Sequence, residues 1–398
     1  MKKFFSFAAI AAMAVAGMIS CSSDDAVENV SYNKTNDNLS GVQFNVHQNG
    51  SLTQASRRAT RGLPTTPSNW QDQISDFQVW GYFAPGATGT GVTAGSLYMG
   101  ESATEGIVFD GTAGSYNYHD ATQMAYWPAT TAPLNFQAIT PAADTEFTIE
   151  NTPNAGLARV TAVVTVPTTC ADQKDIMFAK TDNQTKESSV DHKAALNFQH
   201  GLSQIVFSGR AASENIVAEV GSIEIHNVYN TGKVGFFGSS SALTSSTTGV
   251  AGTTFVPTLL DGVGDLTINS TTAKNITADN GALLMLPQTV SKWATAPGAA
   301  VTLGAADAAH NSYLKVHVNS VTNNGVELFP DVDKRDIYIP LDIAWEQGKK
   351  YIYTIVFGKG VGGYDEDGNP LDNMLPIMFT VTTTDWELAD PQPDEVEF

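Results

Sequence analysis

The chain has 398 residues, 42% of them hydrophobic, which is enough apolar material for one large or two ordinary domains. Its formal net charge is −20, so it lacks the basic surface that nucleic-acid binding requires, and we exclude a nucleic-acid partner. Many Gly, Ser, Thr, Asn and Val residues and few long helical patterns predict an all-β fold rich in turns.

The first segment of the chain predicts export. Two lysines precede the apolar run 4–19, which is typical of a secretion signal and short for a membrane span. A small residue followed by Cys21 resembles the bacterial lipobox, which is cleaved before a cysteine that then carries lipid. We therefore interpret residues 1–20 as a lipoprotein signal peptide and Cys21 as the lipidation site. The alternative is an ordinary signal peptide cut near Ala16.

The cysteine content agrees with this interpretation. The chain holds only Cys21 and Cys170, so lipidation of the first leaves the second without a partner in the chain. We interpret Cys170 as a small, inert residue. An exported protein without disulfides must depend on large cores and on the hydrogen bonds of its sheets.

A strand with alternating apolar residues follows a polar segment. Residues 22–40 are polar and rich in turn formers, which favours a flexible segment. Val42, Phe44 and Val46 then alternate with polar residues, and this period of two predicts a half-buried strand.

The stretch "SRRATRG", residues 56–62, contains three of the six arginines of this acidic chain. Prolines at 64 and 67 would interrupt any ladder, so we expect an exposed loop there. A solvated basic loop without a function is the alternative.

From residue 70 onward, strand-length apolar segments recur between turn signals, a spacing typical of β-sandwiches. In the first half of the chain these segments are 77–84, 106–111, 123–128, 134–141, 147–150, 158–167 and 176–180. The polar stretch 181–193 interrupts the series, which then resumes with "ALNFQHGLSQIVF". We therefore predict two β-sandwich domains in series, with residues 59–190 in the first and 191–387 in the second.

The tail 388–398 is acidic and contains two prolines. Leu388 alternates with polar neighbours, and so do Val396 and Phe398, which is unusual for a merely solvated end. A frayed terminus is the alternative reading.

No catalytic pattern appears in the sequence. The motifs of serine hydrolases, zinc peptidases and P-loop proteins are absent, and the seven histidines are scattered. We predict no enzymatic activity, no cofactor and no metal, and we interpret His200 as a structural residue at a strand end. A hydrolase with an unrecognised site is a remote alternative.

Two further segments admit a binding role. The acidic run 364–373 suggests a calcium loop, but the twelfth position counted from Asp365 is Pro376, so a hairpin loop at Asp367–Gly368 is favoured. Aromatic residues could stack on sugars, although a place in the core is the commoner one for them. These aromatic residues are Trp80, Tyr82, Trp127 and Trp293.

Taken in order, five features of the chain resemble the Bacteroidetes fimbrillins, the subunits of type V pili that are made as lipoprotein precursors. They are the lipobox at Cys21, "SRRATRG", "YWP" with "LNFQAITP" behind it, "ALNFQHGLSQIVF", and the closing "WEQGKKYIYTIVFG" with "IMFTVTTTDWEL". The resemblance covers most of the chain. It implies two tandem transthyretin-like β-sandwich domains and no enzymatic activity.

The resemblance also implies a processing step. The partner would be a trypsin-like protease, with Arg58–Ala59 as the first candidate bond and Arg61–Gly62 as the second. Cleavage would remove the lipidated tether, residues 21–58, together with the first strand. The removable side chains would be Val42, Phe44 and Val46.

Assembly would then proceed by donor-strand exchange with other pilus subunits. The donor residues implied here are Val396 and Phe398, with Leu388 as a third candidate. Prolines in the tail cannot donate to a ladder, which confines pairing to the last residues or to an edge.

The implied location is the outer membrane, through lipid, before processing, and the cell-surface fimbrium afterwards. A stalk position is favoured and a tip position is possible, while the arginines argue against an anchor. The alternative function is a lipid-anchored surface adhesin or glycan-binding module that never polymerises.

Overall fold

The computed structural model describes residues 41–48, 74–102, 104–112, 115–142, 147–151, 160–189, 192–236, 243–247, 252–260, 266–278, 281–293, 300–329, 335–358, 363–371 and 377–385. Almost every regular element among them is a β-strand, which confirms the all-β fold class. The helical elements are η1 (Ala121–Gln123), η2 (Cys170–Asp172) and α3 (Leu303–Ala308). None of the helices in these residues is long and apolar enough to cross a membrane.

The strands fall into two groups along the chain. The first group is β1 (Gln43–Gln48), β2 (Asp76–Phe83), β3 (Leu97–Met99), β4 (Ile107–Thr112), β5 (Ser115–Tyr118), β6 (Leu134–Thr140), β7 (Phe147–Asn151), β8 (Val160–Thr165), β9 (Met177–Gln184) and β10 (Lys193–His200). The second group begins with β11 (Ser203–Ala211), β12 (Ile216–Val228), β13 (Thr231–Phe236), β14 (Leu243–Thr247), β15 (Thr253–Phe255), β16 (Leu266–Ile268), β17 (Lys274–Asn275) and β18 (Leu283–Met285). It ends with β19 (Thr289–Val290), β20 (Tyr313–Asn323), β21 (Val326–Glu327), β22 (Asp336–Pro340), β23 (Ile343–Ala344), β24 (Lys349–Phe357) and β25 (Ile377–Asp385).

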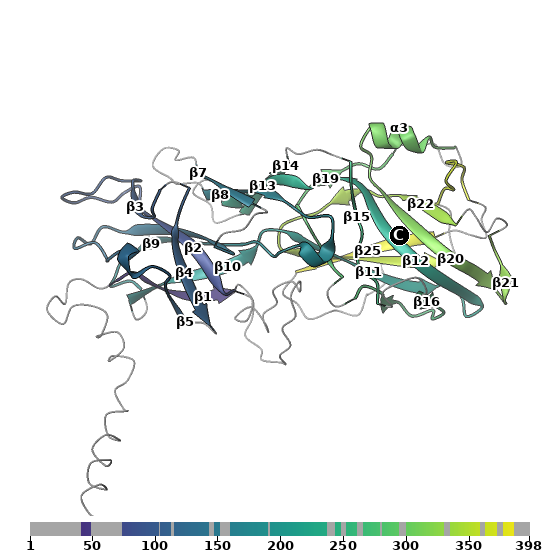
Figure 1. Ribbon diagram of the computed structural model, residues 1–398, viewed down its shortest axis with the longest axis horizontal. Helices are drawn as coiled ribbons and strands as arrows, with labels where there is room; N and C mark the ends of the chain where they lie inside the picture. Colours follow the sequence, from purple (N-terminus) through teal and green to yellow (C-terminus); the bar gives the residue numbers. More distant parts are fainter. Residues whose placement is uncertain are drawn as a thin grey trace, which may run out of the picture.

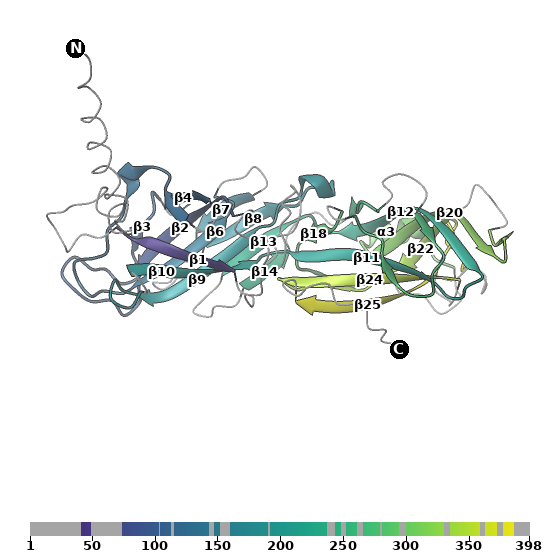
Figure 2. The same ribbon diagram turned by 90° about the horizontal axis from the view of Figure 1, so that it is seen from below.

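These strands build an elongated molecule with sheets at both ends (Figures 1 and 2). At one end lie an eight-stranded sheet, in the order β1-β10-β9-β6-β2-β4-β5 with β3 on β2, and a four-stranded sheet, β14-β13-β8-β7. The other end contains a five-stranded sheet around β11 and β24 and a six-stranded sheet around β12 and β20. A short ladder joins β19 to β23.

The eight-stranded sheet is covered on both faces. Phe77 and Val79 of β2 lie in one core with the side chains of β1 and β4. Trp80 and Tyr82 of the same strand lie in a second core, together with residues of β8. Because both faces are buried, β2 reads as a continuous apolar run rather than an alternating one.

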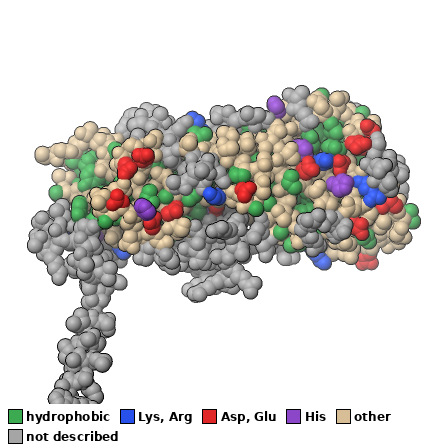
Figure 3. Space-filling model, viewed as in Figure 1, with side chains coloured by type: hydrophobic (Ala, Val, Ile, Leu, Met, Phe, Trp, Pro, Cys, Tyr) green, Lys and Arg blue, Asp and Glu red, His purple; other side chains and the backbone are tan. Residues whose placement is uncertain are grey.

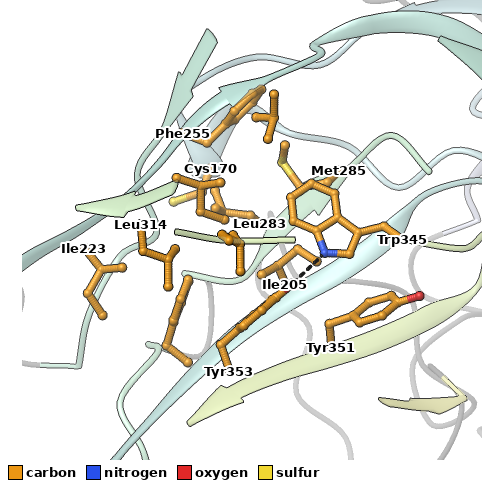
Figure 4. Close-up of a cluster of buried hydrophobic side chains, with 14 of the residues drawn as sticks. Cys170, Ile205, Ile223, Phe255, Leu283, Met285, Leu314, Trp345, Tyr351 and Tyr353 are labelled. Atoms are coloured by element: carbon orange, nitrogen blue, oxygen red, sulfur yellow. Dashed lines mark hydrogen bonds between the residues drawn. The ribbon is translucent and has the colours of Figure 1, made fainter. Parts of the chain in front are cut away.

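At the other end, the five- and six-stranded sheets face each other across a continuous core. Buried side chains of β11, β12, β20 and β24 meet there, as Figure 4 shows for Ile205, Ile223, Leu314 and Tyr353. The indole Nε1 of Trp345 donates a 2.9 Å hydrogen bond to the Tyr353 hydroxyl (Figure 4). Burial raises the pKa of the Tyr353 phenol, which stays neutral in this core.

The chain passes between the two ends more than once. β10 follows the polar stretch 181–193, yet it pairs antiparallel with β9 in the eight-stranded sheet. β13 and β14, later still, share a sheet with β7 and β8. The sheets therefore exchange strands across the break placed at 190/191, and the division into domains 59–190 and 191–387 stays a prediction.

A tight passage links β10 to β11. The chain leaves β10 at His200 and enters β11 at Ser203. A Cβ on Gly201 would lie 2.7 Å from the Phe178 ring, so only glycine fits this passage without a shift. The Gly201 N–H donates to the Ile176 carbonyl at 2.7 Å, which ties the crossing to the neighbouring segment.

Candidate functional site

The best candidate site is the place of β1 at the edge of the eight-stranded sheet (Figure 2). We call the place that the side chains of residues 42–46 fill in the core the groove. β1 pairs in parallel with β10, with Gln43 opposite Lys193 and Phe44 opposite Ala194. This pairing joins segments that lie far apart in the sequence. The strand predicted from the alternation of Val42, Phe44 and Val46 is thereby confirmed as a strand.

The apolar side chains of this strand are almost fully buried. Val42 is 0% exposed, Phe44 is 6% exposed and Val46 is 5% exposed, and all three belong to the core of the eight-stranded sheet. Gln43 and Asn45 between them are half-buried. The side chains of this edge segment are therefore part of the core itself.

The ring of Phe44 sits in a pocket of three aromatic rings, which we call the aromatic pocket: Phe77, Phe109 and Phe136. The ring centroids lie 6.1, 5.2 and 5.1 Å from that of Phe44, and every contact is edge-on, with interplanar angles of 85° to 88°. Such edge-to-face pairs add to the free energy of simple burial. The pocket therefore suits a flat aromatic side chain.

Hydrogen bonds with β5 and with the segment after η1 hold the chain at the start of β1. The Val42 N–H donates to the Ala125 carbonyl at 2.9 Å. The Tyr118 hydroxyl donates to the Val42 carbonyl at 2.7 Å and lies 3.1 Å from the Ala125 carbonyl. Gly41 forms an isolated antiparallel bridge with Tyr126. The two edges of the sheet, β1 and β5, are therefore brought together at this end.

Tyr116 belongs to the same core as the side chains of β1. Burial, and then the nearby Asp76 carboxylate, raise the pKa of Tyr116 to about 12, so this phenol is neutral. Its hydroxyl donates to the Ile74 carbonyl at 2.9 Å. Figure 3 shows acidic side chains spread over the visible face, with few lysines or arginines among them. The buried residues that surround β1 are apolar, which suits an apolar strand.

Several predicted site residues lie outside the described residues. These are the lipidation site Cys21, the processing residues Arg58, Ala59, Arg61 and Gly62, and the donor residues Leu388, Val396 and Phe398. Their roles in lipidation, processing and strand donation stay predictions.

The other candidate residues take structural places. His200 ends β10 and is buried, with Nδ1 2.8 Å from Asp175 Oδ2, which fits its interpretation as a strand-end residue. Cys170 is buried with Sγ 3.0 Å from Thr258 Oγ1. The four aromatic residues considered as sugar platforms are all buried: Trp80, Tyr82, Trp127 and Trp293.

The acidic segment after residue 363 forms a tight hairpin. The Gly368 N–H donates to the Asp365 carbonyl at 3.0 Å, and Gly368 has a φ of 78°, which favours glycine. The Asp365 carboxylate accepts from the Asn369 N–H at 2.7 Å, so it is engaged within the loop. Within the described part of the chain, no three His, Cys, Asp or Glu side chains gather as metal ligands would.

Sequence reasoning missed the residues that shape the groove. Tyr118 stands in "SYNY", a short strand whose alternating tyrosines predict burial but not a contact with Val42. Met124 also escaped notice, although a Cβ on Gly41 would come 3.1 Å from its sulfur. Both contacts depend on the closing of the sheet, which no local pattern reveals.

Comparison with known proteins shows which family the sequence matches. Residues 58–386 match the sequence model of a family described as fimbrillin-like. A search of curated proteins finds no match. Among solved structures, a fimbrial protein from Bacteroides vulgatus aligns with a TM-score of 0.50 at 16% identity, over 78% of this chain and 92% of that one. At this identity the likeness concerns the fold alone.

A second solved structure is similar at a lower level. The fimbrial anchor protein Mfa2 from Porphyromonas gingivalis aligns with a TM-score of 0.33 at 11% identity, over 84% of this chain and 100% of that one. This score is too low to compare positions, and we draw nothing from it about the groove.

Proposed function

Because this chain belongs to the fimbrillin-like family, we propose that it is a structural pilus subunit that polymerises by donor-strand exchange and supports adhesion. The family points to a non-enzymatic protein with a fimbrial or adhesive role at the cell surface. Our proposal adds that the chain is exported as an outer-membrane lipoprotein precursor carrying lipid on Cys21. A stalk position is favoured over a tip.

One observation supports the proposal above all. Val42, Phe44 and Val46 belong to the edge segment of the sheet, and yet their side chains are buried in its core. Loss of this strand would open an apolar trench lined by Ala194, Leu196 and other core residues of the sheet. It would also leave the backbone groups of β10 without the partner strand. A new strand could restore both kinds of contact, as in β-augmentation.

The burial of apolar side chains supplies a driving force for such an assembly. Burial of each Val or Phe side chain contributes roughly 1.5–3 kcal/mol. Three such side chains, with a ladder of hydrogen bonds, would oppose the entropy lost on association, which costs roughly 4–15 kcal/mol. Contacts between a groove on one copy and a strand from the next are heterologous and do not close, so they build fibres.

Processing would free the groove. We propose that a trypsin-like protease cuts after Arg58, or after Arg61, and removes the tether together with β1. The neighbouring subunit would then supply its tail, with Val396 and Phe398 as the donor side chains and Leu388 as a third. Before cleavage, the chain would be held at the outer membrane by its lipid.

Limited trypsin digestion of the full-length chain tests the processing step. We expect the first cut within Arg57–Arg61, a resistant core, and polymer formation only after cleavage. Arg58→Ala combined with Arg61→Ala should block both cleavage and polymerisation. Arg210→Ala, a substitution in the folded strand β11, is the matched control and should leave them unchanged. Early cleavage elsewhere, or polymerisation of the double variant, would contradict the proposal.

The alternative is a lipid-anchored adhesin or glycan-binding module that keeps β1 and never polymerises. Mass spectrometry of the mature protein from cells separates the two cases. A first residue of Ala59 or Gly62 supports processing, whereas a lipidated Cys21 supports permanent anchoring. Deletion of residues 389–398 should abolish polymer under the pilus proposal and change nothing under the alternative.

A further inference from the structure

One hydroxyl group lies between two carbonyl oxygens at the start of β1. The Tyr118 hydroxyl oxygen is 2.7 Å from the Val42 carbonyl oxygen and 3.1 Å from the Ala125 carbonyl oxygen. A phenol has a single proton to donate, so it serves one of these acceptors at a time. While β1 is in place, the shorter distance favours Val42. The Ala125 carbonyl does not depend on this proton, because it accepts from the Val42 N–H at 2.9 Å.

Departure of β1 would take one partner from each of the two groups that stay behind. The Tyr118 hydroxyl would lose its acceptor, the Val42 carbonyl, and the Ala125 carbonyl would lose its donor, the Val42 N–H. The two remaining groups are a donor and an acceptor 3.1 Å apart. Rotation of the hydroxyl about its C–O bond is enough to join them, because a hydroxyl proton turns to suit its acceptor and no heavy atom has to move.

The Tyr118 side chain is held by parts of the sheet other than β1. Its ring lies 4.4 Å, centroid to centroid, from the ring of Phe109 in β4. The backbone pairing of β5 with β4 also places Tyr118 directly opposite Phe109. The position of the hydroxyl therefore has supports that do not involve Val42.

The Ala125 carbonyl is also supported from elsewhere. The turn of η1 before it is capped by Asp120, whose Oδ1 accepts from the Thr122 N–H at 2.8 Å. The carbonyl of the next residue, Tyr126, accepts from the Tyr98 hydroxyl of β3. With both groups held in place, a hydrogen bond between them forms without ordering either one, which favours it over separate bonds to water.

We propose that Tyr118 is a hydrogen-bond switch. Its hydroxyl donates to the Val42 carbonyl while β1 is attached and to the Ala125 carbonyl when β1 is absent. The switch keeps β5 joined to the segment after η1 in both forms, and it leaves neither group without a partner, which lowers the cost of emptying the groove. This inference rests on the proposed function, in which β1 leaves, and adds a residue that prepares the sheet for that step.

Native-state hydrogen exchange of the full chain tests the switch. The amides of β1 that pair with β10 exchange when β1 detaches, whereas the slowest amides of β12 and β20 exchange on global unfolding. In the wild type we expect the β1 amides to exchange at least about tenfold faster than those slowest amides, because an edge strand can detach while the rest of the sheet stays folded.

Tyr118→Phe separates a switch from a simple anchor. The variant keeps the ring against Phe109 and removes one hydrogen bond from each of the two forms. We therefore expect exchange in β1 to stay within about twofold of wild type, while the slowest amides of β12 and β20 exchange about fivefold faster, the effect of one hydrogen bond. An anchor that serves β1 alone would lose its bond only in the attached form, and β1 would then exchange about fivefold faster as well.

Val46→Ala is the matched control for a contact that exists only in the attached form. The Val46 side chain is 5% exposed in the groove, so its truncation should accelerate exchange in β1 by at least about tenfold.

Three outcomes would overturn the switch. They are equal acceleration of β1 and of β12 with β20 in Tyr118→Phe, no acceleration in any of these strands, and exchange of β1 only together with β12 and β20 in the wild type. Failure of the proposed function is seen separately, as absence of polymer from the processed chain, and it leaves the exchange result intact.

Discussion

Phe44→Ala removes the central side chain of β1 and tests whether the aromatic pocket holds this strand. The ring is 6% exposed and touches three other rings edge-on. Truncation of a buried phenylalanine to alanine costs about 3–5 kcal/mol, which includes the lost transfer free energy and the cavity left behind. We therefore expect the unprocessed chain to lose about 3–5 kcal/mol of its free energy of unfolding.

Urea unfolding followed by tryptophan fluorescence measures this loss. Trp127 is a suitable reporter, because its ring lies 6.0 Å from that of Phe136 in the pocket. With a slope of about 1–3 kcal/mol per molar urea, the midpoint should fall by at least about 1 M. The control is Asn45→Ala, the half-buried neighbour in β1, whose effect should stay within about 0.5 kcal/mol.

A small effect, or one shared with the control variant, would contradict this expectation. A loss below about 1 kcal/mol for Phe44→Ala would mean that the pocket collapses around the vacancy or that β1 contributes little to the core. Equal losses for Phe44→Ala and Asn45→Ala would mean that the alternation of buried and half-buried residues does not determine how β1 is held.

Two further predictions concern polar groups of the sheets. His200→Ala should lower the free energy of unfolding by about 1–3 kcal/mol, because it removes a buried hydrogen bond to Asp175. His119→Ala removes one partner of an exposed pair and should leave the melting temperature unchanged. Equal effects of the two variants in thermal unfolding would contradict this prediction. Burial raises the pKa of Asp336, but hydrogen bonds from His317 and Lys315 outweigh it and hold the pKa below its usual range. The stability from this carboxylate is therefore present above the ordinary pKa of an aspartate and is lost as the pH falls through the lowered value. Asp336→Asn should flatten the fall in melting temperature between about pH 5 and pH 2, and an unchanged acid profile would rule this out.

Local patterns were sufficient to predict β1 and its buried residues. The alternation of Val42, Phe44 and Val46 is a property of six consecutive residues, and strand geometry turns it directly into one buried face. The same holds for the hairpin at Gly368, whose sequence requires a tight turn. These features need no knowledge of the rest of the chain.

The pairing of strands that are far apart along the chain could not be predicted from the sequence. Nothing in β1 or β10 alone indicates that Phe44 lies opposite Ala194, or that the two run in parallel. The placement of β13 beside β8 was equally hidden, because it depends on the path of the chain between two ends of the molecule. The hydrogen bond from the Tyr118 hydroxyl to the Val42 carbonyl was hidden for the same reason, because it forms only when β1 and β5 come together in the folded sheet.

The parallel pairing of β1 with β10, followed by the tight passage at Gly201 into β11, has a mechanical consequence. A strand in this groove runs in the same direction as β10. The chain then continues from β10 through Gly201 into β11, which belongs to the five-stranded sheet. Tension along the long axis would pull the two strands past each other, so that the whole ladder bears the load at once. Rupture by shear needs all these hydrogen bonds to break together, whereas peeling would break them one by one. The covalent path from β10 to β11 would then pass the load to the second half of the molecule.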